Sequence, residues 1–390
     1  MNWDDKISKN VQAIKPSGIR KFFDIANQIP GVLSLSIGEP DFAAPDKVCE
    51  AMKASIDARQ TSYTANSGLI ELRQEIAKLF HDRYGVDYDP VDEIMVTVGA
   101  SEGLTMALLA LTEPGDEVII PDPAYVAYPA AVKAAGGVPV FVPTYAQDDF
   151  KVTAEALEQV VTPKTKALVM GYPNNPTGTV MTREELLPIA EFVKKHDLVV
   201  MSDEIYCELV YGDTKFTSFA NLPDMRERTI VLNGFSKAYA MTGMRLGYVC
   251  APRDGLANIL KLHQYMIMCA NTQAQYGGIT ALRDCAADVE SMRQEYDARR
   301  KVIYKGLVDM GLPVFEPKGA FYIFPDISCT GMNSEEFCEK LVKEEKVAVV
   351  PGTAFGACGE NHVRISYAAS METIKEALKR MARFVEKYRK

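Results

Sequence analysis

The sequence contains few of the residues from which disulfides and metal sites are built. Its eight cysteines stand singly among 390 residues with no C-x-x-C pair, and its four histidines are far apart. Small secreted domains have dense cysteine frameworks, and zinc sites need closely spaced Cys and His ligands. The scarcity therefore favours reduced thiols in a cytoplasmic protein, and we expect no metal site.

Long hydrophobic runs and an excess of basic residues are also missing. Lys and Arg number 43 against 52 Asp and Glu, which gives a formal net charge of −9. Nucleic-acid-binding proteins carry a basic face, and a membrane helix needs about 20 apolar residues in a row. Residues 1–5 also lack the pattern of a signal peptide. We therefore expect no nucleic-acid partner, no membrane association and a cytoplasmic location.

One basic cluster, at residues 379–390, stands apart from this acidic balance. Its spacing fits the polar face and last turn of a terminal helix, where cations complement the helix dipole. A helix end is favoured over a nucleic-acid tail, because charge runs usually form solvated faces.

Short apolar segments alternate with amphipathic ones between residues 93 and 251. Strands are predicted at 93–98, 117–121, 138–143, 166–172, 198–203, 229–233 and 246–251. Helical patterns lie between several of them, at 101–111, 124–135, 153–161 and 182–196. This alternation predicts an α/β protein with a mainly parallel sheet flanked by helices, in which ligands bind at the carboxyl ends of the strands.

The pattern changes after about residue 280. Helices are predicted at 290–307, 334–344 and 371–388, and strands at 320–324, 347–350 and 363–367. We interpret residues 47–285 as a large domain, and residues 1–46 with 286–390 as a smaller α+β domain.

Four stretches with chemically useful side chains lie at or just beyond strand ends. They are residues 97–103 (TVGASEG), 172–178 (YPNNPTG), 202–206 (SDEIY) and 233–237 (NGFSK). Each alone has a structural explanation, since N-N-P-T-G forms a good turn, Gly99 can open a helix and Asp203 can cap one. A lone lysine in a loop, such as Lys237, is usually solvated. Their shared position at one sheet edge is what indicates a site.

In their order and their amino-acid sequences, the four stretches together resemble the fold-type-I enzymes that use pyridoxal 5′-phosphate (PLP), specifically the class I and II aminotransferases. The resemblance runs from residues 36–42 (SIGEPDF) to 363–367 (VRISY), and its most specific element is 236–247 (SKAYAMTGMRLG). It implies the PLP-dependent transferase fold and the exchange of amino groups between an amino acid and a 2-oxo acid such as 2-oxoglutarate.

The resemblance also assigns residues to the cofactor's reactive end. It places the Schiff-base lysine, which also carries the proton from Cα, at Lys237. Asp203 is expected to face the pyridine nitrogen and keep it protonated. Tyr206 and Asn175 match residues that hydrogen-bond the phenolic oxygen, and Tyr125 matches the aromatic residue that stacks on the ring.

For the phosphate, the resemblance implies a pocket rich in donors. Backbone amides of Gly99, Ala100 and Ser101 open a predicted helix, where free N–H groups and the dipole favour an anion. Ser236 and Arg245 match the family's side-chain ligands for the same group.

Three further assignments follow from the resemblance. Arg364 matches the arginine that binds the substrate's α-carboxylate, with Asn175 nearby, and Gly38 lets its backbone approach that carboxylate closely. Tyr63 matches a tyrosine that reaches the phosphate from the neighbouring subunit, which implies a homodimer.

The class of substrate is indicated by one position at which this sequence differs from the family's motif. The aspartate-and-prephenate branch has a lysine where this chain has Ser101, and that lysine engages the substrate's distal carboxylate. Residues 17–24 (SGIRKFFD) look more like the aromatic and broad-specificity branch, which includes enzymes for N-acetyl-diaminopimelate. We expect an aromatic or bulky neutral donor, while aspartate and N-acetyl-diaminopimelate stay open.

Three alternatives remain at the level of sequence. A PLP-dependent C–S β-lyase would share the fold and nearly all of these residues. A transcription regulator with an aminotransferase-like ligand domain would need a winged helix before residue 36, where only about 35 residues stand. A nicotinamide dehydrogenase would need G-x-G-x-x-G after its first strand, and none is present.

Overall fold

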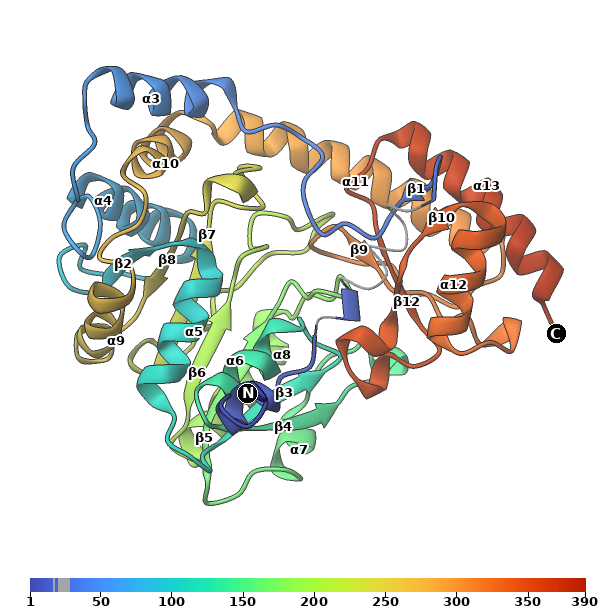
Figure 1. The fold of residues 1–390 in the computed structure, drawn as a ribbon, viewed down its shortest axis with the longest axis horizontal. Coiled ribbons are helices and arrows are strands. Elements are labelled where there is room, and N and C mark those ends of the chain that lie inside the picture. Colours follow the sequence, from blue (N-terminus) through green and yellow to red (C-terminus); the bar gives the residue numbers. More distant parts are fainter. Residues whose placement is uncertain (17, 20–28) are drawn as a thin grey trace.

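The computed structural model describes residues 1–16, 18–19 and 29–390 (Figure 1). Its centre is a seven-stranded sheet in the order β2-β8-β7-β6-β5-β3-β4. β8 runs antiparallel to both its neighbours, and the other pairings are parallel, so the predicted α/β class is confirmed. The strands are β2 (Ile94–Thr97), β3 (Glu117–Asp122), β4 (Val138–Pro143), β5 (Thr165–Gly171), β6 (Val199–Asp203), β7 (Thr229–Gly234) and β8 (Gly247–Cys250).

Helices cover both faces of this sheet because its strands are apolar on both faces. On β3, Val118 and Ile120 pack with α5, α6 and α9, whereas Ile119 between them packs with α7 and α8. Successive strand residues point to opposite faces, so one continuous apolar run supplies two cores. The helices of this part are α3 (Asp46–Asp57), α4 (Ile70–Leu79), α5 (Gly99–Leu111), α6 (Ala127–Ala134), α7 (Ala154–Glu158), α8 (Arg183–Lys195), α9 (Arg253–Met266) and α10 (Thr272–Asp284).

A second group of elements lies at the far end of the long helix α11 (Ala286–Asp309), on the right in Figure 1. It contains a three-stranded sheet in the order β11-β12-β9, and β1 from the N-terminal part pairs in parallel with β10. Its elements are β1 (Leu33–Ser34), β9 (Tyr322–Ile323), α12 (Ser334–Glu345), β10 (Val347–Ala348), β11 (Val350–Pro351), β12 (Val363–Ser366) and α13 (Met371–Tyr388); the short α1 (Lys9–Gln12) lies near α6.

The single strand predicted at 347–350 is wrong in one respect. The segment changes partner at Val349, so that β10 pairs with β1 while β11 pairs antiparallel with β12. A run of apolar residues fits either sheet, and only the positions of β1 and β12 decide where one pairing ends.

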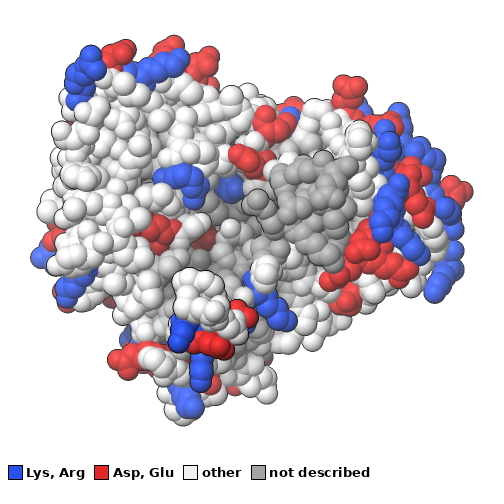
Figure 2. Space-filling model, in the orientation of Figure 1, with Lys and Arg blue, Asp and Glu red and all other residues white. Residues whose placement is uncertain are grey.

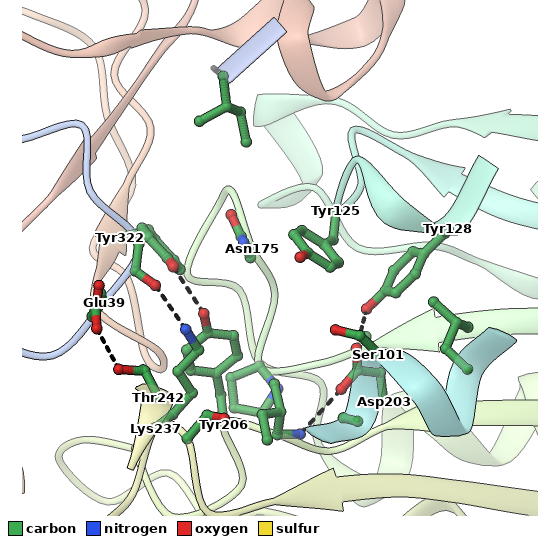
Figure 3. A pocket seen from close by; sticks show the side chains of 18 of the residues that line it. Glu39, Ser101, Tyr125, Tyr128, Asn175, Asp203, Tyr206, Lys237, Thr242 and Tyr322 are labelled. Atoms are coloured by element: carbon green, nitrogen blue, oxygen red, sulfur yellow. Dashed lines mark hydrogen bonds between the residues drawn. The ribbon is translucent and has the colours of Figure 1, made fainter. Parts of the chain in front are cut away.

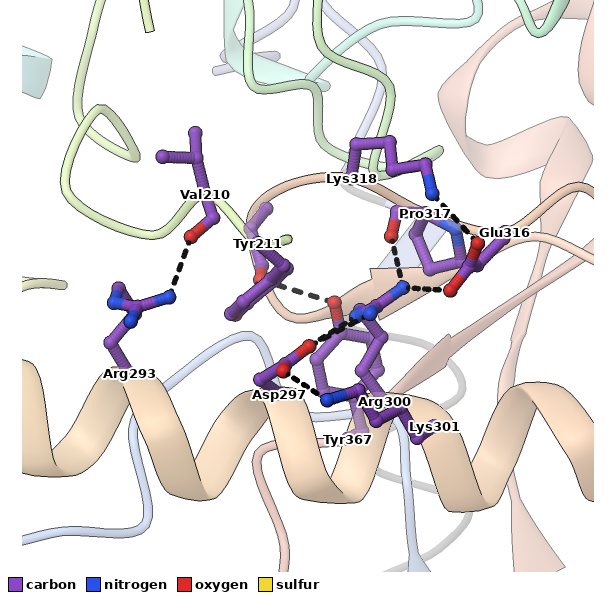
Figure 4. A network of polar contacts seen from close by, with 11 residues as sticks. Val210, Tyr211, Arg293, Asp297, Arg300, Lys301, Glu316, Pro317, Lys318 and Tyr367 are labelled. Atoms are coloured by element: carbon purple, nitrogen blue, oxygen red, sulfur yellow. Dashed lines mark hydrogen bonds and ion pairs between the residues drawn. The ribbon is translucent and has the colours of Figure 1, made fainter. Parts of the chain in front are cut away.

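A polar network ties α11 to the loop before β9 (Figure 4). Arg300 is buried on α11 and forms ion pairs with Asp297 at 2.8 Å and Glu316 at 2.6 Å. It also donates to the backbone oxygen of Pro317 at 3.1 Å. Each charge in this network therefore has a partner, which buried charges require for stability.

The basic cluster near the C-terminus lies on α13, as predicted, and its cations alternate with acidic residues (Figure 2). Arg380 pairs with Glu376, Arg383 with Glu345, and Lys387 with Glu344. The positive charge of this helix is thus largely balanced by acidic residues on α13 itself and on the neighbouring α12.

Among the described helices, none is both long and apolar enough to cross a bilayer. Within the same residues, no group of three or more His, Cys, Asp or Glu side chains is arranged to hold a metal ion.

Candidate active site

A cavity of about 320 Å³ opens at the carboxyl ends of β5, β6 and β7, where the parallel-sheet rule predicts a ligand. Every predicted site residue lines it except Gly99 and Tyr63. In Figure 3, Lys237 and Tyr322 lie on one side of the cavity, and Tyr125, Ser101 and Asp203 lie on the other. The structure therefore brings together side chains from both groups of elements.

Lys237 enters the cavity from the loop after β7, and its Nζ donates a hydrogen bond to the Gly38 oxygen at 2.7 Å. Burial lowers the pKa of Lys237 to about 8, although Glu39 opposes this change, and the positive charge of Arg364 lowers it further. A useful fraction of the amine is thus neutral near pH 7, as a nucleophile or base requires.

Asp203 is the last residue of β6 and reaches the floor of the cavity. Its Oδ2 accepts a hydrogen bond from the Tyr128 hydroxyl at 2.8 Å, and its Oδ1 accepts one from the Ile205 amide at 3.3 Å. Burial raises the pKa of Asp203, while the Tyr128 hydrogen bond lowers it. The carboxylate is fixed in direction and is suited to a cationic ligand atom. Tyr125 lies just before α6, the helix that contains Tyr128, and the centres of the two rings are 5.6 Å apart in an edge-to-face arrangement.

The N-terminus of α5 forms the donor-rich end of the cavity. Val98 provides no side-chain cap, so the first amides of the helix are left for a ligand. Gly99 has a φ of +74°, and a Cβ there would lie 2.5 Å from Nη2 of Arg245. Only glycine therefore lets the guanidinium approach these amides, and together they suit a phosphate dianion.

Arg364, on β12, is only 2% exposed, and none of the described carboxylates pairs with it. Its Nη1 donates to Oδ1 of Asn175 at 3.1 Å and its Nη2 to the Ser36 oxygen at 2.6 Å, while its Nε has no partner among the described residues. The guanidinium lies 4.6 Å from the ring centre of Tyr322. An incoming carboxylate would pair with the charge of Arg364 and complete its hydrogen bonding.

The same cavity contains a hydroxyl pair. Tyr206 and Tyr322 are buried, and their hydroxyl oxygens are 2.8 Å apart. This contact holds the Tyr206 hydroxyl at a fixed point between the loop after β6 and strand β9.

The known proteins similar to this chain include aromatic, aspartate and N-acetyl-LL-diaminopimelate aminotransferases. Residues 30–381 match the family described as aminotransferase class I and II. The chain belongs to this family. It is 52% identical over 381 residues to the putative aminotransferase YugH of Bacillus subtilis, with 98% of each chain covered. It is 49% identical over 377 residues to an aspartate aminotransferase of Pyrococcus abyssi, covering 96% of this chain and 97% of that protein.

A solved structure extends the similarity to three dimensions. The aromatic aminotransferase of Pyrococcus horikoshii matches with a TM-score of 0.90 at 48% identity, covering 94% of this chain and 99% of that one. The predictions of a transaminase, of PLP as its cofactor and of amino acids and 2-oxo acids as its substrates are confirmed. Nothing in these relatives favours the lyase alternative.

The residues of this aminotransferase fit PLP in their chemistry. The cavity offers an amine of lowered pKa for an aldehyde, a fixed carboxylate for a pyridine nitrogen, and a helix N-terminus with an arginine for a phosphate. These groups stand at separate points of one cavity, as the three ends of such a cofactor require.

Sequence reasoning missed several residues of the cavity. Tyr128 follows Tyr125 by three positions on a predicted helix, so its shared face could have been inferred. Tyr322, Glu39 and Thr242 gave no signal, because their contacts join segments far apart in the chain.

Of the other residues that the sequence analysis singled out, Tyr63 lies outside the cavity lining, whereas Ile19 of the segment 17–24 is part of it. Tyr63 is 79% exposed, which leaves its predicted role to a second subunit. The segment 17–24, which suggested the aromatic branch, lies outside the described residues except for 18–19.

Proposed function

We propose that this aminotransferase takes an aromatic or other bulky neutral amino acid as donor and 2-oxoglutarate as acceptor. The observation that carries the proposal is Ser101 in the cavity wall. Among the described residues that line the cavity, the basic ones are Lys237, Arg245 and Arg364. We assign Lys237 to the cofactor's aldehyde, Arg245 to its phosphate and Arg364 to the substrate's α-carboxylate. None of the described cavity residues is therefore left as a cation for the distal carboxylate of a short donor, and burying that carboxylate unpaired is unfavourable.

PLP, when bound, supplies an electron sink that stabilises negative charge at the substrate's Cα. We assign Lys237 as the residue that holds the cofactor and then moves the proton at Cα, as its lowered pKa allows. Asp203, oriented by Tyr128, keeps a proton on the ring nitrogen. Tyr206 donates to the phenolic oxygen, and Tyr125 covers one face of the ring.

The phosphate is assigned to the amides of Gly99, Ala100 and Ser101, with Ser236 and Arg245 as side-chain ligands. The free helix N-terminus and the close approach of Arg245 to Gly99 support this assignment. Phosphate binding at this end leaves the opposite end of the cavity for the substrate.

The substrate's α-carboxylate is assigned to Arg364, with Asn175 beside it. Support comes from the guanidinium's neutral partners and from its unpartnered Nε. The backbone of Gly38 borders the same space, and a Cβ there would lie 3.7 Å from Nη1 of Arg364. The second carboxylate of 2-oxoglutarate is bound by a rearranged hydrogen-bond network or by a mobile arginine.

We also propose a cytoplasmic homodimer in which Tyr63 of one subunit reaches the phosphate of the other. The exposed Tyr63 ring supports this arrangement, because the described residues of its own chain leave it uncovered. The division into residues 47–285 and residues 1–46 with 286–390 is proposed on the pairing of β1 with β10.

A panel of donors tests the substrate proposal. With 2-oxoglutarate as acceptor, we expect phenylalanine, tyrosine or methionine to exceed aspartate in kcat/KM, measured by cofactor absorbance in single half-reactions. Ser101→Lys should raise kcat/KM for aspartate about tenfold, since it restores a partner for the distal carboxylate (about 1.4 kcal/mol). A wild-type enzyme that prefers aspartate tenfold over all neutral donors would refute the proposal.

Borohydride reduction tests the assignment of Lys237. Reduction of the holoenzyme should fix a pyridoxyl group, and peptide mapping should find its mass on the peptide that contains Lys237. A label on any other lysine would overturn the assignment of the site.

A further inference from the structure

A buried pair of side chains lies behind the N-terminus of α5, outside the cavity itself. His263 on α9 is fully buried, and its Nδ1 is 2.6 Å from Oε1 of Glu102. Glu102 belongs to the first turn of α5, and its side chain is only 7% exposed. Nε2 of His263 is buried without a hydrogen-bond partner among the described residues, so burying this nitrogen is unfavourable for folding.

The second oxygen of Glu102 connects this pair to the turn that leads into the helix. Its Oε2 accepts a hydrogen bond from the backbone amide of Val98 at 2.5 Å. Val98 is the residue before Gly99, and its own side chain does not cap the helix. One carboxylate thus joins α9, through His263, to the backbone that sets the direction of the amides of 99–101.

The direction of this carboxylate also matters electrostatically. A carboxylate in the first turn is attracted to the helix N-terminus, where it would compete with a bound anion for the free amides and repel it. Held by His263 on one oxygen and by Val98 on the other, Glu102 supports the turn from behind.

We propose that His263 is a positioning residue that, through Glu102, sets the affinity of the Val98–Ser101 turn for the cofactor's phosphate. This inference rests on the proposed placement of that phosphate at the N-terminus of α5. His263 itself does not line the cavity, so its effect is transmitted through the backbone. Such a role predicts a change that depends on the phosphate and leaves the rest of the cofactor's binding intact.

The experiment compares apoenzyme affinity for PLP with affinity for pyridoxal, which lacks the phosphate. In His263→Phe, which keeps the ring volume, we expect the ratio of the two affinities to fall at least tenfold. His263→Asn, whose amide nitrogen stands near the place of Nδ1, should restore the ratio to within about threefold of wild type. Glu102→Ala removes the support of the Val98 amide together with the competing negative charge, should lower the ratio by less than His263→Phe does, and serves if His263→Phe does not fold.

His196→Phe is the matched control, because His196 forms a similar pair with Glu158 at 3.1 Å, away from the cavity. Its ratio should equal that of wild type. An unchanged ratio in both His263→Phe and Glu102→Ala, an equal loss for both ligands, or the same fall in His196→Phe would overturn the inference. A wild-type enzyme with no preference for PLP over pyridoxal would instead overturn the placement of the phosphate.

Discussion

Two buried arginines in this enzyme have opposite surroundings. Arg300 in the α11 network is 3% exposed, and Arg364 in the cavity is 2% exposed. Arg300 faces two carboxylates, which raise its pKa overall although burial alone lowers it (Figure 4). The partners of Arg364 among the described residues are neutral oxygens, and burial lowers its pKa.

The difference separates a structural charge from a binding charge. Burying a cation is unfavourable unless it is paired, so a network that closes on itself contributes to a stable fold. A buried cation left incompletely paired lowers stability, and an anionic ligand recovers part of that loss on binding. We therefore expect changes in the cavity to alter activity and changes in the network to alter stability.

The largest effect should come from Lys237→Ala. Removing the amine should lower kcat about a thousandfold or more, because no other described group replaces it as the proton carrier at Cα. PLP should still bind through its phosphate and ring contacts, and the apoenzyme's urea midpoint should stay near that of wild type. Lys318→Ala, a lysine of the network, is the control. A Lys237→Ala enzyme that kept more than about a tenth of wild-type kcat would contradict the role assigned to Lys237.

The next effect should be on stability, in Arg300→Met. Truncation leaves Asp297 and Glu316 near a neutral side chain, which costs roughly 3 kcal/mol of unfolding free energy. Lys301 and Lys318 still pair with these two acids and limit the loss. Urea unfolding of the apoenzyme measures it, and kcat/KM should change less than twofold.

Arg293→Met is the control on the same helix. Arg293 pairs with the half-exposed Glu290, and such pairs contribute about 1 kcal/mol or less. If the two variants lost equal stability, burial of the Arg300 network would not be the cause.

A smaller effect, on activity alone, should follow Arg364→Leu. We expect kcat/KM to fall roughly a hundredfold, or about 2.7 kcal/mol, because the substrate's α-carboxylate loses the cation proposed for it. Unfolding free energy should not fall, since the variant removes an incompletely paired buried charge. A loss of stability similar to that of Arg300→Met, with kcat/KM unchanged, would show that the two arginines do not differ in the way described.

The fold was largely predictable because its central strands are short, continuous apolar segments. A strand buried on both faces needs such a segment, and the seven predicted strands agree with β2 to β8 within one residue at each end. Prediction failed at Val349, where a strand changes partner, since pairing depends on elements far away in the sequence.

The site was predictable only where residues lie at strand ends or in sequence motifs that resemble those of the family. Asp203 and Lys237 met both conditions, and the structure places them in one cavity. The Tyr206–Tyr322 pair and the bridge from His263 to Glu102 join residues more than one hundred positions apart. Contacts of this kind arise from packing between helices and sheets, which sequence patterns do not specify.

The smallest expected effect concerns pH and shows which arginine acts on the cavity. The pKa of Lys237 is lowered to about 8, first by burial and, with Glu39 opposing, also by the charges of Arg364 and Arg245. Only the neutral amine attacks an aldehyde, so the rate at which apoenzyme captures PLP should rise almost tenfold from pH 6 to pH 7 and level off above about pH 9. Arg364→Leu removes a nearby cation and should shift this profile to higher pH, whereas Arg300→Met should leave it in place. Stopped-flow absorbance gives the rates. A wild-type rate still rising almost tenfold from pH 8 to pH 9 would mean that Lys237 keeps the pKa of an ordinary lysine, and that neither burial nor Arg364 prepares it for reaction.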